Sequence, residues 1–142
     1  MATTYEEIIG YLKEDGLSFD DRRDSDEGLV LFFSKSEMDD KPEVVSIKLD
    51  EDGEFIHFYE PQRYTFLPGL SNEKVFELLL IIQNETKMLQ WEYDPADGEI
   101  RACVELPLED ALLTKRLFMR VLNGLVKMMD VSHERILSML EQ

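Results

Sequence analysis

The sequence predicts an α+β fold in which an antiparallel β-sheet is covered by helices packed mainly on one face. Two observations carry this prediction. Strand-like segments follow one another through short turns, and amphipathic helical segments fall before, between and after these runs of strands. The chain has 142 residues, of which 44% are hydrophobic, and it shows no internal repeat and no break in composition. A single domain spanning residues 1–142 is therefore expected.

The first expected element is a helix over about 4–15. Thr4 and Glu7 have the spacing of a capping box, in which the hydroxyl and the carboxylate each accept a backbone N–H at the start of a helix. Ile8, Ile9 and Leu12 then recur at helical spacing. Because the capping signal and the apolar periodicity both indicate a helix, we predict an amphipathic helix as the first element.

Four strand signals follow and predict a meander. They lie at 17–24, 29–33, 44–49 and 54–60. The third and fourth alternate apolar and polar residues, and the turn between them ends in Gly53, which is placed to take a positive φ. Residues 61–69 contain two prolines and a glycine, and we expect no regular element there.

The second half of the chain repeats the alternation of helix and hairpin. The expected elements are a helix over 75–83 capped by Ser71 or Asn72, strands over 88–93 and 99–106, a helix over 117–129 capped by Thr114, and a last short helix that starts at Asp130 or Ser132. The hairpin is indicated by the turn residues at 94–98 between two alternating segments. The helices are indicated by apolar stripes of period 3.6.

Charge and targeting signals narrow the class of protein. Fifteen Lys+Arg oppose 31 Asp+Glu, for a formal charge of −16, which disfavours binding to nucleic acid and to anionic membranes. The longest apolar block, 78–82, is far shorter than the ~20 residues that span a bilayer, and the first residues lack a signal-peptide pattern. Cys103 has no second cysteine to pair with, as is usual in a reducing compartment. We expect a soluble, cytoplasmic protein without membrane insertion.

No motif specifies a reaction. The glycines do not fit a nucleotide-binding loop, and Leu137 stands where a zinc-binding helix that starts at His133 needs its second histidine. His57 is expected to fill sheet surface, His133 to be solvated and Cys103 to be an inert thiol. We therefore predict a non-enzymatic protein with no catalytic, cofactor-binding or metal-ligating residues.

The apolar content exceeds what a two-layer domain of this size is expected to hide. Residues 29–33 are apolar on both faces of a strand, and 75–82 are apolar around most of a helix. We expect a second copy or another protein to cover the surplus, with a homodimer as the commonest symmetric solution. The candidate partner-binding residues are Leu29, Leu31, Phe33, Leu78, Ile82, Trp91 and Tyr93.

The C-terminal half resembles a known family. The segments that carry the resemblance are WEYDPADGEIR at 91–101, VELPLED at 104–110 and the apolar helix over 117–129. They are similar to the YbjN-like family, in particular to members of the cyanobacterial type, and that family resembles type III secretion chaperones in fold. The resemblance implies a secretion-chaperone-like two-layer sandwich that is acidic, dimeric and binds other proteins. It carries over no catalytic residue.

Two functions from different classes follow. The first is a protein-interaction module, chaperone-like or regulatory, that acts as a homodimer, with the strand over 29–33 available to an extended segment of a client. The alternative is a small-ligand-binding sensory module with a pocket under the 61–70 loop, in which His57 or Arg63 orients the ligand. An enzyme ranks third, because the sequence pairs no carboxylates for acid–base chemistry.

Overall fold

The computed structural model describes residues 2–35, 42–65 and 72–140 and confirms the α+β class. Its elements are α1 (Tyr5–Glu14), β1 (Asp20–Arg22), the 3₁₀ turn η1 (Arg23–Ser25), β2 (Gly28–Lys35), β3 (Pro42–Asp50), the 3₁₀ turn η2 (Glu51–Gly53), β4 (Phe55–Thr65), α2 (Glu73–Glu85), β5 (Gln90–Asp94), β6 (Glu99–Pro107) and α3 (Lys115–Leu140).

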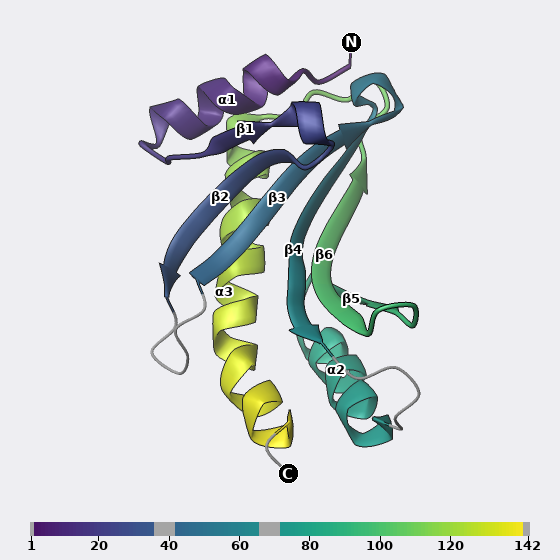
Figure 1. The fold of residues 1–142 in the computed structure, drawn as a ribbon. Coiled ribbons are helices and arrows are strands. Elements are labelled where there is room, and N and C mark those ends of the chain that lie inside the picture. Colours follow the sequence, from purple (N-terminus) through teal and green to yellow (C-terminus); the bar gives the residue numbers. More distant parts are fainter. Residues whose placement is uncertain (1, 36–41, 66–71, 141–142) are drawn as a thin grey trace.

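The strands form one twisted antiparallel sheet in the order β1-β2-β3-β4-β6-β5 (Figure 1). The first four strands are the predicted meander. The predicted hairpin of β5 and β6 joins it through β6, which pairs with β4, so that β5 lies at the edge. In Figure 1, α3 runs behind the sheet along its length, α1 lies across one end and α2 lies at the other.

One apolar core joins the inner face of the sheet to α3 and α1. Phe58 on β4 and Phe118 on α3 are fully buried, and their ring centroids are 5.5 Å apart. Ile8 and Leu12 of α1 are also fully buried. Tyr11 of α1 contacts Phe118 of α3 with ring centroids 5.8 Å apart, and its hydroxyl donates a hydrogen bond of 2.6 Å to the carbonyl of Leu113, just before α3. The core therefore joins the sheet to both helices in one unit.

Two of the three predicted helix caps form, whereas Asn72 at the start of α2 makes no side-chain capping hydrogen bond and Ser71 lies outside the described residues. The Thr4 Oγ1 atom accepts the Glu7 backbone N–H at 3.2 Å at the start of α1, and the Thr114 Oγ1 atom accepts the Leu117 N–H at the start of α3. Gly53 has a φ of +89° at the end of η2, as the turn requires. These caps and turns are encoded over a few residues, so they can be predicted from the sequence.

The expectation that residues 61–69 form no regular element is wrong for 61–65. Strand β4 continues through Pro61 to Thr65, and its register with β6 shifts between Glu60 and Tyr64. Such a shift marks a β-bulge. Pro61, which has no backbone N–H, is tolerated there because the hydrogen-bond ladder is already interrupted. The remainder, 66–69, lies outside the described residues.

The expected break at Asp130 or Ser132 is absent, and α3 is a single helix of 26 residues. Neither glycine nor proline occurs between Leu125 and Leu140, so nothing in the backbone ends the helix. Ser132 is buried inside the helix instead of capping a new one. Where a helix is held by packing on both sides of such a residue, capping preference does not decide its boundary.

Candidate functional site

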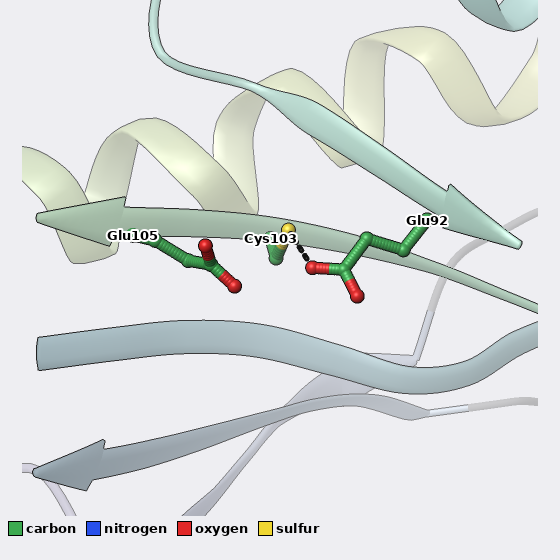
Figure 2. A group of neighbouring side chains, drawn as sticks. All are labelled: Glu92, Cys103 and Glu105. Carbon is green, nitrogen blue, oxygen red and sulfur yellow. Dashed lines mark hydrogen bonds between the residues drawn. The ribbon is translucent and has the colours of Figure 1, made fainter. Parts of the chain in front are cut away.

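The outer face of the sheet, turned away from α3, carries a polar hollow of about 210 Å³. Side chains from four adjacent strands line it, among them Asp50, His57, Glu92, Arg101, Cys103 and Glu105. Figure 2 shows three of them extending from β5 and β6 on the side of the sheet opposite α3. Within the described residues, no helix covers this face.

Strand register brings these side chains together. His57 on β4 lies opposite Lys48 on β3 and opposite Glu105 on β6. Cys103 lies one row further along, opposite Gln90 on β5. Because alternate residues of a strand share a face, the polar half of β6 that the sequence predicts forms the floor of the hollow.

Cys103 is a buried, protonated thiol. Its side chain is almost fully enclosed, and Sγ donates a hydrogen bond of 3.0 Å to the Glu92 Oε1 atom (Figure 2). Burial and the Glu92 carboxylate raise the pKa of the thiol far above its ordinary value. At neutral pH the group is therefore a thiol and not a thiolate.

Glu92 stays ionised between two donors. Burial opposes the charge, but the hydrogen bonds from Cys103 and Arg101 lower the pKa of the Glu92 carboxyl below its ordinary value. Arg101 donates from Nε at 3.1 Å and from Nη2 at 2.8 Å, and both bonds end on Oε2. The other oxygen, Oε1, is thus left facing Cys103. Arg101 also lies over the ring of Tyr59 at 5.7 Å.

His57 links two carboxylates across the hollow. Its Nε2 atom is 2.7 Å from Asp50 Oδ2 and its Nδ1 atom is 3.3 Å from Glu105 Oε1. The side chain fills the surface of the sheet, as predicted. The carboxylates around His57 and Arg101 make an arrangement that can hold a cationic or hydrogen-bonding ligand.

His133 is not solvated, so that expectation is wrong. It is buried on the inner side of α3, where Nδ1 lies 2.5 Å from the Tyr64 hydroxyl and the two rings stack with centroids 5.8 Å apart. The prediction failed because it placed His133 in the first turn of a separate helix, and the continuous α3 turns this side chain toward β4 instead.

The seven candidate partner-binding residues do not form one surface. Four of them, Leu29, Leu31, Leu78 and Ile82, are buried in the core of this chain, while Phe33 and Trp91 pack partly against it. Of the seven, Tyr93 is the one residue that is exposed, at 39%. A partner cannot reach the four core residues in this structure.

A different apolar surface lies where α2 meets β5. Leu80 is 65% exposed, and Phe76, one turn earlier on α2, packs on Tyr93 with ring centroids 5.0 Å apart. We call these three residues the α2–β5 strip. The sequence shows Phe76 and Leu80 at i, i+4 spacing, which indicates a shared helix face but not which face is left open.

The pocket expected under the 61–70 loop in the alternative function lies outside the described residues. Residues 66–71 and the side chain of Arg63 lie outside the described residues. His57 lies on the outer sheet face, in the polar hollow.

The described helices include none that combines the length and apolar character needed to cross a membrane.

Comparisons with known proteins identify the class of fold. The six-stranded antiparallel sheet with its helices has a YbjN-like, chaperone-like fold. A crystal structure of YbjN from E. coli matches with a TM-score of 0.63 at 13% sequence identity, covering 92% of this chain and 89% of that chain.

A second solved structure is the heterodimeric complex ExoU-SpcU from the type III secretion system of Pseudomonas aeruginosa. It matches with a TM-score of 0.53 at 16% identity, covering 92% of this chain and 94% of that chain. No protein-family model and no curated protein matches the sequence. At these identities the likeness defines the fold.

Proposed function

We propose that this chain is a non-enzymatic protein-interaction module, chaperone-like or regulatory, that acts as a homodimer. The observation that carries the proposal is the α2–β5 strip, which exposes Leu80 and Tyr93 side by side with Phe76. The fold supports the same reading, since one neighbour of similar fold occurs in a heterodimeric protein complex.

The strip has the composition of a binding surface. Aromatic and aliphatic side chains that stay exposed on a folded chain gain free energy when a partner buries them, about 1.5–3 kcal/mol for a fully buried Leu or Phe. Aromatic residues are enriched among those that dominate interface energy. Removing the strip from water is therefore the expected driving force for association.

The remaining features fit a binding protein of the cytoplasm. Residues 1–142 form a single domain in this proposal, because one sheet and one core join α1 to α3. The net charge of −16 disfavours nucleic acid as the partner. A buried, unpaired Cys103 suits a reducing compartment.

Leu80→Glu tests the role of the strip. Because it places a charge in the centre of the proposed interface, we expect sedimentation equilibrium to show a dimer dissociation constant at least about tenfold weaker than in the unchanged chain. The matched control is Leu112→Glu, an equally exposed leucine (72%) in the β6–α3 connection, at the opposite end of the sheet from α2 in Figure 1. It should leave the constant unchanged.

Two results would overturn this role. One is a monomer for the unchanged chain at all concentrations. The other is equal weakening by Leu80→Glu and Leu112→Glu, since both substitutions add the same charge and only one lies on the strip.

A second candidate function is a small-ligand-binding sensory module. The polar hollow favours it, because His57, Arg101 and three carboxylates converge there from four strands. A thermal-shift screen against metabolites tests it: a ligand that binds the folded chain should raise the melting temperature by a few degrees, and His57→Asn should abolish the shift. A panel without any stabilising compound would count against this function.

A further inference from the structure

Three potential metal ligands meet in the polar hollow, although the sequence shows no metal-binding motif. One ligand atom each from Glu92, Cys103 and Glu105 lies within 4.8 Å of the others (Figure 2). Zn–S and Zn–O bonds of about 2.3 and 2.0–2.2 Å place the donor atoms of a tetrahedral site roughly 3.6 Å apart, so modest side-chain movements bring these three atoms within reach of one ion. A fourth group, the His57 Nδ1 atom, is 3.3 Å from Glu105 Oε1.

The direction in which the Cys103 side chain points also favours a ligand in the hollow. The residue is only 2% exposed, yet its thiol is aimed into the hollow rather than into the core. Besides the hydrogen bond to Glu92, the thiol has a second acceptor, the Gln90 Oε1 atom. That atom is 4.0 Å away, which is the outer limit for a hydrogen bond from sulfur. A well-enclosed sulfur is thus directed at an open volume lined by oxygen donors.

Arg101 orients the cluster without occupying it. Both of its hydrogen bonds end on Glu92 Oε2, while Oε1 faces the sulfur. One carboxylate oxygen is therefore available to an ion while the other fixes the side chain. This is the arrangement by which outer hydrogen bonds position the groups that bind a metal.

We propose that Cys103, Glu92 and Glu105 bind a divalent transition-metal ion of the Zn²⁺ type, with His57 or water completing the coordination. A thiolate with carboxylate and imidazole groups suits Zn²⁺ or Co²⁺, whereas Mg²⁺ and Ca²⁺ take oxygen ligands alone. On binding, the metal–sulfur bond replaces the sulfur–hydrogen bond, and the proton passes to the solvent. The site is independent of the protein-interaction role.

Cobalt provides the test, because a Co²⁺–thiolate bond gives a charge-transfer absorption that a carboxylate-bound ion does not. Titration of the full chain with CoCl₂ should produce this band at one ion per chain, and ZnCl₂ should remove it by competition. Cys103→Ser should abolish the band, and Glu92→Gln and Glu105→Gln should each weaken Co²⁺ binding at least about tenfold.

Glu134→Gln, an exposed change on α3 that removes the same charge, should leave the titration unaltered. The proposal is overturned if no charge-transfer band forms. It is equally overturned if Cys103→Ser, folded by circular dichroism, binds Zn²⁺ as tightly as the unchanged chain. The ion would then be held by the acidic surface in general. Neither result bears on the dimer, which is measured by sedimentation.

Discussion

At the scale of single residues, burial decides chemistry that the sequence leaves open. Alternation along β6 correctly predicts that Cys103 shares a face with Glu105, but not that the thiol is enclosed. His133 is a second case in which the sequence does not predict burial, since histidine occurs both at the surface and in the core of proteins. Which of the two it meets depends on the path of a helix that contacts β4, far away in the sequence.

The buried contact between Tyr64 and His133 makes a measurable contribution to stability. Tyr64→Phe removes the hydroxyl that lies 2.5 Å from His133 Nδ1 while keeping the ring. We expect urea denaturation to show a loss of about 1–2 kcal/mol in the free energy of unfolding, the typical cost of deleting one member of a buried hydrogen bond. Tyr59→Phe, on the outer face, is the control and should cost less than about 0.5 kcal/mol.

An equal loss in both variants would show that the hydroxyl of Tyr64 contributes no more than a surface one. The contact would then be a consequence of ring packing alone.

At the scale of elements, the sequence predicts the caps and turns that neighbouring residues determine. It does not predict strand bounds that depend on pairing with a distant strand. The cap at Thr4, the turn at Gly53 and the hairpin around 94–98 each depend on a few neighbouring residues, and each is present. Strand β4 runs past Pro61 because its pairing with β6 resumes beyond the bulge. No local rule predicts that resumption.

The turn before β2 depends on a glycine for space as well as for conformation. Gly28 has a φ of +74°, and a Cβ atom there would lie 2.2 Å from the carbonyl oxygen of Ile47. Gly28→Ala should therefore destabilise the chain by roughly 2 kcal/mol or more in thermal or urea unfolding.

Gly10 gives the opposite expectation within the same chain. It lies in α1 with nothing within 4 Å of the added Cβ, so Gly10→Ala should raise the free energy of unfolding by about 0.5–1 kcal/mol. If both alanine variants shifted stability in the same direction, the close approach at Gly28 would not be the cause.

At the scale of the whole molecule, the fold class and the element types follow from period and turn signals. The position of β6 between β4 and β5 does not, since strand order depends on contacts between distant segments. The polar hollow has the same origin: residues 92, 103 and 105 show no metal-binding spacing, and only the pairing of β5 with β6 brings them together.

The expected surplus of apolar surface is smaller than the composition indicates. Leu29, Leu31, Leu78 and Ile82 all find cover within the chain. Periodicity shows which faces of a strand or helix are apolar. It does not show which of these faces α1 and α3 cover. What stays open within the described residues is scattered, apart from the α2–β5 strip.

The pairing of β4 with β6 also governs how such a chain can fold. Every other strand pair joins neighbours along the sequence, whereas this ladder closes across all of α2 and β5. Closing so long a loop costs conformational entropy, and the interactions of the ladder offset this cost only after the two strands have paired. We therefore expect the local hairpins and helices to form before the N-terminal meander pairs with the C-terminal hairpin through β4 and β6.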